Sequence, residues 1–490
     1  MTAYHPFLLA DFYKISHRAM YPERTEFVYS TWTARGSRVE GVDEVVAFGF
    51  QAFVQRWLIE YFNEHFFARP QGEVLDEYRR VISATLGVEN PDTTHLADLH
   101  ALGYLPLEIR AVAEGTRVPT RVPMLTIENT DPRFFWLTNA LETLMSAELW
   151  QPTTSATIAA RYREILDGYA EKTTGSTEGV QFQGHDFSMR GMEGMDAAAA
   201  SGAGHLLSFV GTDTIPAILF HERYYGANVE TELVGTSIPA TEHSVMCAYG
   251  QDEIGAFRRL ITEVHPGGFI SIVSDTWDLW QVIGEVLPTL RDEVLERDGR
   301  VVIRPDSGDP VLIMTGDPQA EGLARVGVVE ALWDIFGGTV NELGYKVLDS
   351  HIGAIYGDSI TMARAEEISR RLMDKGFAST NAVYGIGSYT YQYQTRDTFE
   401  MALKATWVQI DGVEQAIFKD PATDVRKVKR SAKGRVAVLA GETGLYLVDE
   451  LDRADWTALA ERDQLTPLFR DGELLRRTTL AEIRERVAEG

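Results

Sequence analysis

Short apolar runs alternate with helix-length stretches between about residue 155 and residue 390, and polar side chains follow the runs. The runs at 269–273, 301–303 and 351–356 are rich in isoleucine and valine, which is typical of buried strands. Alternation of this kind predicts parallel strands joined by right-handed crossovers, with all carboxyl ends on one face. An α/β barrel and an open doubly wound sheet both fit, because both place their sites at those ends.

The run at 301–303 ends abruptly at Arg304, Pro305 and Asp306. An arginine can bind phosphate oxygens with two parallel hydrogen bonds, and an aspartate can hold Mg²⁺ or its water. A phosphate-and-metal ligand would therefore suit this strand end. A surface ion pair at a turn is the alternative explanation.

Other strand ends carry similar polar residues. The apolar run at 206–210 is interpreted as a strand that ends at Asp213, although an aspartate at such a turn is commonly a helix cap. The remaining polar strand ends are Ser274-Asp275, Gly357-Asp358 and Gly387-Ser388. Their convergence on one face is stronger support for an active site than any single turn.

Two segments contain histidines. Residues 185–191 (HDFSMRG) combine His185, Phe187 and Arg190, but a helix N-terminus with a buried core histidine would also explain them. His243 has polar neighbours that could orient it as a base, a proton donor or a nucleophile for phosphate. Most isolated histidines have none of these roles.

Basic residues gather late in an otherwise acidic chain. Arg396, Lys404 and Lys419 lie close to expected strands and are candidates for polyphosphate contacts. We interpret the cluster at 426–435 mainly as a solvated hairpin.

The two ends of the chain differ from its middle. Strands are expected at 26–31, 107–112 and 124–128, and again at 402–410, 436–440 and 444–448. We therefore expect three parts, in which residues 1–154 and 391–490 form one flanking α+β domain around a catalytic domain at 155–390.

Bulk properties exclude several classes of protein. A net charge of −26 argues against a nucleic-acid or anionic-membrane partner. A single cysteine, Cys247, excludes an intrachain disulfide and a multi-cysteine metal site. Since neither a signal peptide nor a transmembrane run is apparent, we expect a soluble cytoplasmic protein.

Taken in order, the motifs resemble the nicotinamide phosphoribosyltransferases, relatives of the nicotinate enzymes. The resemblance rests on residues 9–14 (LADFYK), 128–132 (ENTDP), 185–191, 211–214 (GTDT), 237–244 (SIPATEHS), 271–275 (SIVSD), 303–308 (IRPDSG), 357–358 (GD) and 418–421 (FKDP). It implies synthesis of nicotinamide mononucleotide and pyrophosphate from nicotinamide and phosphoribosyl pyrophosphate. It also implies a type II phosphoribosyltransferase fold, an irregular α/β barrel with a flanking domain from both chain ends, and a homodimer with shared sites.

The resemblance also implies residue roles. The pyridine ring would stack between Phe187 and Tyr13 of a partner subunit, and Asp213 would accept a hydrogen bond from the carboxamide. Arg190, Arg304 and His243 would surround pyrophosphate, and ATP would phosphorylate His243. Mg²⁺ would ride on pyrophosphate near Asp275 and Asp306. Further substrate contacts would come from Ser237, Ser271, Asp306, Gly357, Asp358, Gly387 and Ser388, and further phosphate contacts from Arg35, Arg396, Lys404 and Lys419.

Three alternatives remain open. A nicotinate phosphoribosyltransferase would share the fold, but an ionised Asp213 would repel a carboxylate substrate. A non-catalytic nucleotide sensor would keep the pocket, and a Mg²⁺-dependent sugar-phosphate hydrolase would use Asp275, Asp306 and Asp358.

Ser388 departs from the resemblance, because a longer glycine run is expected there.

Overall fold

The computed structural model describes residues 4–419 and 431–489, which form two compact units. Unit 1 combines Met1–Thr157, Phe220–Ala227 and Gln394–Gly490, and unit 2 combines Ile158–Leu219 with Asn228–Tyr393. The boundary at residue 157 falls inside the long helix α6 (Glu142–Thr174).

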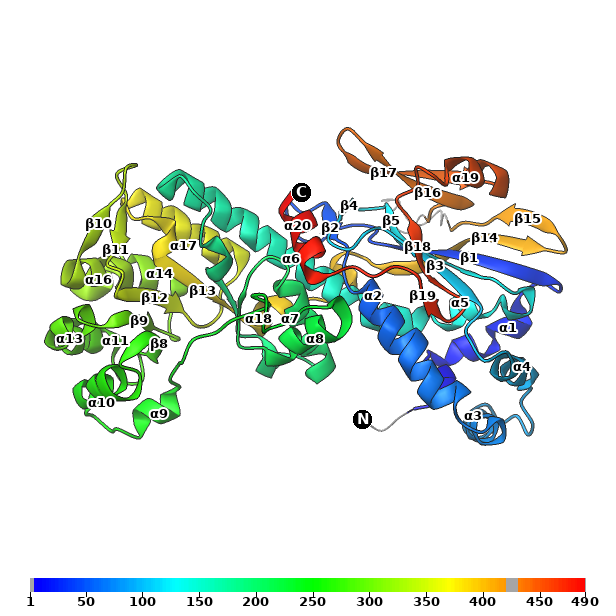
Figure 1. Cartoon of the computed structure of the whole chain (residues 1–490), viewed down its shortest axis with the longest axis horizontal. Coiled ribbons are helices and arrows are strands. Elements are labelled where there is room, and N and C mark those ends of the chain that lie inside the picture. The colour runs from blue at the N-terminus through cyan, green and yellow to red at the C-terminus, as the bar shows by residue number, and fades with distance from the viewer. Residues whose placement is uncertain (1–3, 420–430, 490) are drawn as a thin grey trace. The chain divides into compact units, whose positions relative to one another are not determined.

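Unit 2 contains a six-stranded, all-parallel sheet with the order β7-β6-β13-β12-β9-β8. Its strands β8, β9, β12 and β13 are labelled in Figure 1. The expected strands at 269–273, 301–303 and 351–356 are confirmed. Two further strands, β6 and β7, are very short. The expectation of a strand at 206–210 is wrong, because these residues lie between the end of α7 at His205 and the start of β7 at Gly211. The strands are β6 (Gly184–Asp186), β7 (Gly211–Thr212), β8 (Gly267–Val273), β9 (Asp298–Arg304), β12 (Ile352–Tyr356) and β13 (Ala382–Ile386).

An irregular segment, residues 236–241, joins the two edge strands β7 and β8. The Thr236 amide donates to the Val210 carbonyl at 2.7 Å, and the Thr212 amide donates to the Thr236 carbonyl at 2.9 Å. On the other side, the Ser271 amide donates to the Pro239 carbonyl at 2.8 Å, and the Thr241 amide donates to the Ser271 carbonyl at 3.0 Å. The sheet is thereby closed into an irregular α/β barrel, as expected. Around the closed barrel the strands follow the order of the chain, from β6 and β7 to β8, β9, β12 and β13.

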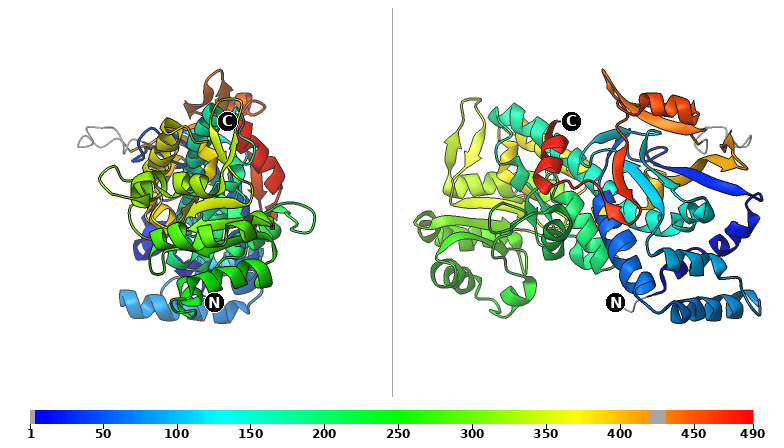
Figure 2. Two further views of the ribbon diagram at one scale, coloured as in Figure 1. Left: turned by 90° about the vertical axis from the view of Figure 1, so that its left-hand side faces the viewer. Right: turned by 45° about the vertical axis from the view of Figure 1, so that its right-hand side comes forward.

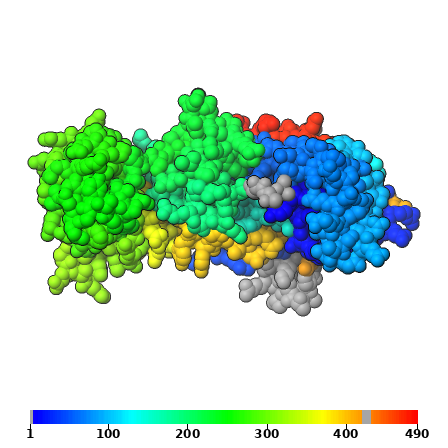
Figure 3. Space-filling view, turned by 90° about the horizontal axis from the view of Figure 1, so that it is seen from below, coloured from blue at the N-terminus to red at the C-terminus, as the bar shows by residue number. Residues whose placement is uncertain are grey.

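Helices connect the strands on the outside of the barrel. In α17 (Met362–Asp374), Thr361 caps the first turn and the buried Ala365, Ile368 and Leu372 recur at helical spacing, so one apolar face packs inward. The outer surface of unit 2 is visible as green and yellow-green atoms in Figure 3. The other helices include α7 (Met195–His205), α8 (Ile215–Tyr225), α9 (His243–Cys247), α10 (Glu253–Arg259), α11 (Leu279–Gln281), α13 (Arg291–Leu295), α14 (Pro310–Thr315), α16 (Val328–Phe336) and α18 (Ser388–Tyr391), with a hairpin of β10 (Gly338–Val340) and β11 (Lys346–Leu348).

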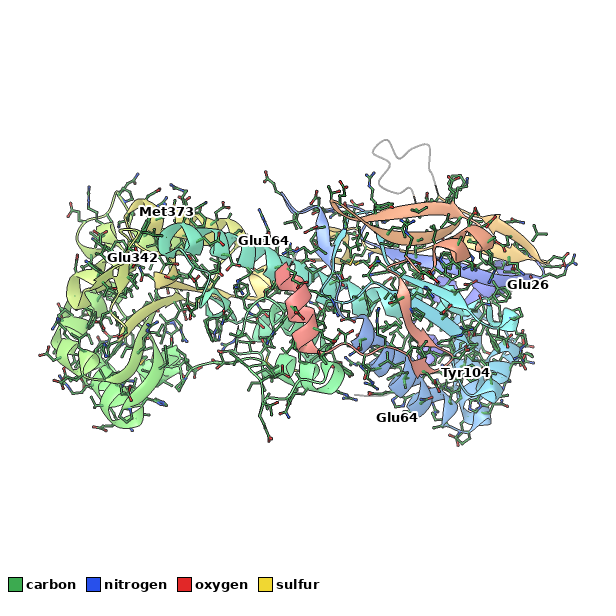
Figure 4. The ribbon with its side chains drawn as sticks, turned by 45° about the horizontal axis from the view of Figure 1, so that its top comes forward. Glu26, Glu64, Tyr104, Glu164, Glu342 and Met373 are labelled. Atoms are coloured by element: carbon green, nitrogen blue, oxygen red, sulfur yellow. The ribbon has the colours of Figure 1, made fainter. Side chains whose placement is uncertain are left out.

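Unit 1 is built around an antiparallel seven-stranded sheet with the order β15-β14-β1-β5-β3-β18-β19. Both ends of the chain supply strands, as expected. Where β1 meets the turn after β14, Glu26 accepts hydrogen bonds from Gln409 Nε2 at 2.8 Å and from the Gly412 amide at 2.9 Å (Figure 4). The strands are β1 (Thr25–Thr33), β3 (Leu107–Ala111), β5 (Pro123–Asn129), β14 (Ala402–Ile410), β15 (Val413–Ala416), β18 (Thr466–Arg470) and β19 (Glu473–Leu474).

Smaller elements complete unit 1. A hairpin of β16 (Arg435–Gly441) and β17 (Gly444–Leu451) packs beside α19 (Arg453–Leu459) (Figure 2). A helical stretch early in the chain is formed by α2 (Phe50–Phe53) and the π-helices η3 (Val54–Tyr61) and η4 (Asn63–Phe67). The remaining elements include β2 (Glu44–Val46), β4 (Arg117–Pro119), α3 (Gln71–Leu86), α4 (Thr94–Leu102) and α20 (Leu480–Glu489).

Arg435 is a buried cation at the base of the β16–β17 hairpin. Its side chain is 0% exposed, lies over the Trp407 ring at 4.1 Å and donates to Glu128 at 3.0 Å. The expectation that 426–435 is a solvated hairpin is therefore wrong at Arg435, because this guanidinium is covered by aromatic rings. Arg426, Lys427, Lys429 and Arg430 lie outside the described residues.

Glu128→Ala should destabilise the protein strongly, because it leaves the buried Arg435 charge without its carboxylate. We expect the free energy of unfolding in urea to fall by roughly 3–5 kcal/mol. Arg24→Ala is the matched control, since the Arg24–Asp411 pair has side chains 73% and 57% exposed and such pairs contribute about 0–1 kcal/mol. Equal losses in the two variants would contradict the importance of the buried pair.

Candidate active site

The polar residues expected at strand ends lie at the carboxyl ends of the barrel strands. Phe187 follows β6, Asp213 follows β7, Asp275 follows β8 and Asp306 follows β9. Because the parallel strands close into a barrel, these ends form one face of unit 2. Gly357-Asp358 follows β12, and Gly387-Ser388 follows β13.

Asp275 organises the loop after β9. Its Oδ2 accepts hydrogen bonds from the amides of Asp306 at 2.8 Å and Ser307 at 2.7 Å. The side chain is only 7% exposed, and its Oδ1 is buried without a hydrogen-bond partner among the described residues. Asp275 therefore fixes the backbone that carries Asp306 and keeps one carboxylate oxygen for another group.

His243 begins α9 and faces both of these carboxylates. Its Nε2 lies 3.8 Å from Asp275 Oδ1 and 3.8 Å from Asp306 Oδ2. Its Nδ1 lies 3.1 Å from the Thr276 hydroxyl, and its side chain is 46% exposed. With Nδ1 engaged by Thr276, Nε2 is the nitrogen available for chemistry on this face.

Arg304 and Asp306 emerge together at the end of β9. Arg304 Nη2 donates to the Thr241 carbonyl at 2.6 Å, and its Nε lies 3.6 Å from Asp306 Oδ1. Arg304 is thus tied to the segment that closes the barrel. Its side chain is only 12% exposed, so water screens its positive charge little and the charge interacts strongly with a ligand bound next to it.

Negative charge is crowded around Asp306. Burial raises the pKa of Asp306, repulsion from Asp275 and Asp358 adds to the rise, and Arg304 and His243 oppose it. Among the described residues, no group of three histidine, cysteine, aspartate or glutamate side chains could hold a metal ion by itself. A cation here would need oxygen ligands from a bound molecule as well.

Gly357 makes room for Asp306. A Cβ atom at position 357 would lie 1.8 Å from Asp306 Oδ1, far inside any allowed contact. Asp358 is exposed and its Oδ2 accepts a hydrogen bond from the Ser359 hydroxyl at 3.0 Å. The carboxyl group of Asp306 therefore lies directly on the backbone after β12.

A second group of residues gathers between β6, β7 and β13. The Phe187 ring lies against Gly385, where a Cβ would come within 2.7 Å of Phe187 Cδ2. Asp213 Oδ1 accepts hydrogen bonds from the Ser237 hydroxyl at 2.6 Å and from His185 Nε2 at 2.9 Å. An aromatic face next to a hydrogen-bonded carboxylate suits a small ring with a polar substituent.

Asp213 is held in its ionised form. Burial alone would raise the pKa of Asp213, but the hydrogen bonds from His185 and Ser237, with the nearby Arg304 charge, hold it below its usual value. The carboxylate therefore accepts hydrogen bonds at neutral pH and cannot donate one.

Ser388 and Ser271 are two further residues that were expected to contact the substrate. Ser388 packs against Gly191, because a Cβ at position 191 would lie 2.2 Å from Ser388 Oγ. Its hydroxyl therefore lies beside the exposed Arg190 loop, η7 (Met189–Gly191). Ser271 is buried, and its Oγ has no hydrogen-bond partner among the described residues.

Two of the residues expected to contact phosphate, Arg35 and Lys404, lie near each other in unit 1. Lys404 Nζ lies 3.2 Å from Glu142 Oε1, and Arg35 Nε donates to the Glu400 carbonyl at 2.9 Å. Burial lowers the pKa of Lys404, Glu142 opposes this, and Arg35 adds to it. Arg35 and Lys404 therefore lie close together beside the Glu142 carboxylate.

Three more expected residues lie in unit 1. Tyr13, in the 3₁₀ helix η2 (Phe12–Ser16), is 58% exposed, and Arg396 pairs with Asp397 at 3.0 Å. The Lys419 amide donates to the Ser431 hydroxyl at 3.0 Å.

His185 is the residue whose role the sequence analysis left undecided. It is part of β6, two residues before Phe187, and it contacts Asp213 directly. Side chains two residues apart along a strand lie on the same side, so His185 and Phe187 share one side. This spacing is the signal that could have identified His185 as a residue of the site. The alternative of a helix N-terminus at this point is wrong.

Asp306→Asn should stabilise the ligand-free protein at neutral pH. A carboxyl whose pKa is raised by folding disfavours the folded state when ionised, and this penalty disappears once both states are protonated. We expect a higher Tm for Asp306→Asn at about pH 7, with the gain shrinking toward about pH 4, near the ordinary aspartate pKa of about 3.9.

Differential scanning calorimetry across this pH range measures the effect. Asp334→Asn, on the exposed side of α16, is the matched control and should show no such trend. A lower Tm for Asp306→Asn at neutral pH would contradict the crowding of charge described above.

Comparisons with known proteins are consistent with this geometry. Residues 182–465 match the model of the nicotinate phosphoribosyltransferase (NAPRTase) family, and residues 6–69 match that of the nicotinamide phosphoribosyltransferase N-terminal domain. The chain is 49% identical to a nicotinamide phosphoribosyltransferase of Acinetobacter baylyi, over 99% of this chain and 97% of that protein. It is 35% identical to one of Xanthomonas campestris, over 97% of each.

Solved structures support the fold. A nicotinate-nucleotide pyrophosphorylase of Pyrococcus furiosus superposes with a TM-score of 0.60 at 15% identity, covering 99% of this chain and 95% of that chain. Human nicotinic acid phosphoribosyltransferase superposes with a TM-score of 0.53 at 16% identity, covering 98% of this chain and 93% of that chain.

None of the described helices is both long enough and apolar enough to cross a membrane.

Proposed function

Because the chain belongs to the nicotinate phosphoribosyltransferase family, we propose that it is a nicotinamide phosphoribosyltransferase. It would form nicotinamide mononucleotide and pyrophosphate from nicotinamide and phosphoribosyl pyrophosphate, as a step of NAD salvage. The names of the relatives from Acinetobacter baylyi and Xanthomonas campestris support this choice.

The hydrogen-bonded Asp213 carboxylate carries the choice of substrate. An ionised carboxylate accepts a hydrogen bond from the amide of nicotinamide but repels the carboxylate of nicotinate in a partly buried site. The Phe187 ring beside it offers an apolar face for the pyridine. A nicotinate enzyme would be expected to lack this negative charge.

The reaction needs positioning and charge stabilisation more than proton transfer. The lone pair of the pyridine nitrogen forms the new bond to ribose C1, while the C1–oxygen bond breaks and its electron pair leaves with pyrophosphate. Arg304 and Arg190 would stabilise the charge that gathers on this leaving group. Asp306 and Asp358 would hold the ribose hydroxyls, with Gly357, Gly387, Ser388 and Ser271 as further substrate contacts.

Mg²⁺ fits this chemistry as a partner of pyrophosphate. Two buried carboxylate oxygens, Asp275 Oδ1 and Asp306 Oδ1, have no hydrogen-bond partner among the described residues. They could accept hydrogen bonds from metal-bound water or ligate the ion together with phosphate oxygens. When bound, Mg²⁺ would neutralise part of the charge on the leaving group.

The first test is to mix the protein with nicotinamide, phosphoribosyl pyrophosphate and Mg²⁺. Nicotinamide mononucleotide and pyrophosphate should appear in equal amounts, and chelation of Mg²⁺ should stop the reaction. Free ribose phosphate without any base consumption would indicate a hydrolase, and binding without any product would indicate a sensor.

Asp213→Asn should weaken the preference for nicotinamide over nicotinate. Removing the negative charge removes the repulsion of nicotinate, so we expect the ratio of kcat/KM values to fall by roughly tenfold or more, equivalent to about 1.4 kcal/mol. Steady-state kinetics with both bases measure the ratio. An unchanged ratio would exclude Asp213 from substrate choice.

We also propose that ATP phosphorylates His243 and that the phosphohistidine enhances synthesis. The contact with Thr276 leaves Nε2 as the attacking atom, which would form the bond to the γ-phosphorus while ADP departs. The new phosphate would lie beside Asp275 and Asp306, where the like charges favour its pairing with a cation.

His243→Ala should abolish stimulation by ATP while basal synthesis of nicotinamide mononucleotide persists within about tenfold, because pyridine attack needs no base. An acid-labile phosphate on the wild-type protein should be absent from the variant. His265→Ala, located before the start of β8, is the matched control. Complete loss of basal activity in His243→Ala would indicate a direct catalytic role instead.

The basic residues expected to contact phosphate in unit 1 fit a homodimer with shared sites. In this arrangement Tyr13 of a partner copy would stack on the pyridine ring, and Arg35, Arg396, Lys404 and Lys419 would neutralise substrate phosphates. The exposure of Tyr13 is consistent with a contact of this kind. A cytoplasmic location stays a prediction of the sequence.

A further inference from the structure

His185 is held in a fixed orientation by the β6–β7 pair. It is paired with Gly211 in the parallel register, and a Cβ at position 211 would lie 2.8 Å from His185 Nδ1. The ring centroid of Phe187 lies 4.6 Å away on the same strand. The imidazole is thus confined by backbone and by an aromatic ring, with a side chain only 12% exposed.

This confinement directs the opposite edge of the imidazole at Asp213. Nε2 lies 2.9 Å from Asp213 Oδ1, and because Asp213 is ionised, the Nε2–H group donates. The Nδ1 edge faces Gly211, so Nε2 is the ring nitrogen that faces the carboxylate. His185 is therefore a preorganised donor and not a mobile side chain.

Both donors to Asp213 use the same oxygen. Ser237 donates to Oδ1 at 2.6 Å, as His185 does at 2.9 Å, and in the described part of the chain neither hydrogen bond goes to Oδ2. Two donors on Oδ1 fix the plane of the carboxylate. Oδ2 is then the oxygen left to accept a hydrogen bond from a ligand.

We propose that His185 is a positioning residue that sets substrate choice through Asp213. By donating to Oδ1 it presents Oδ2 to the carboxamide of nicotinamide and keeps the carboxylate ionised against nicotinate. The inference rests on the proposed function, and it assigns a role to a histidine that contacts the carboxylate and not the reacting atoms.

Three substitutions separate positioning from packing. His185→Leu removes the donor and keeps the volume. His185→Gln can return an amide N–H to the place of Nε2, whereas the shorter side chain of His185→Asn cannot reach Asp213. His185→Asn also provides a polar variant without a donor at the place of Nε2, if His185→Leu does not fold.

Kinetics with nicotinamide and nicotinate should show a specific loss. For His185→Leu and His185→Asn we expect KM for nicotinamide to rise more than kcat falls, and the preference for nicotinamide to drop roughly 10- to 100-fold, the range for losing a hydrogen bond to a charged group. His185→Gln should recover most of the preference. An unchanged preference in both His185→Leu and His185→Asn, or equal losses in all three variants, would overturn the proposal.

A double-mutant cycle tests whether His185 acts through Asp213. In an Asp213→Asn background, His185→Leu should change the preference less than about twofold, because the carboxylate it orients is gone. Additive losses would mean that His185 contacts the substrate itself and would contradict positioning. Failure of the wild-type protein to make nicotinamide mononucleotide would instead refute the proposed function, so the two failures are distinguishable.

Discussion

The backbone hydrogen bonds of residues 236–241 are the constraint on which the site depends. They join β7 to β8 and turn an open parallel sheet into a barrel. The same segment carries Ser237 to Asp213 and presents the Thr241 carbonyl to Arg304. Without this closure, Asp213 and Asp275 would follow the two outer strands of an open sheet and could not serve one substrate.

A second feature of the site is the arrangement of negative and positive side chains at the carboxyl ends of the barrel strands. Asp275, Asp306 and Asp358 concentrate negative charge at the ends of β8, β9 and β12, and burial raises the pKa of Asp306. Arg304 lies beside Asp306, and its charge also helps to lower the pKa of Asp213. Such a face suits a ligand that brings both phosphates and a cation, because each partner then relieves a charge that the fold leaves uncompensated.

The regular part of the barrel could be predicted from the sequence, and its closure could not. The runs that became β8, β9 and β12 carry clear strand patterns with polar ends, so the positions of Asp275 and Asp306 followed. The strands β6 and β7 are too short for a pattern, and residues 236–241 have none. The pairing of His185 with Asp213 depends on the β6–β7 register, and the burial of Arg435 depends on rings distant in the sequence.

The most direct measurement is a crystal structure of the protein with nicotinamide mononucleotide. The account predicts the pyridine ring on Phe187, with the carboxamide nitrogen about 3 Å from Asp213 Oδ2. The ribose should lie toward Asp306 and Gly357. A nucleotide bound away from these strand ends, or a carboxamide with no hydrogen bond to Asp213, would contradict it.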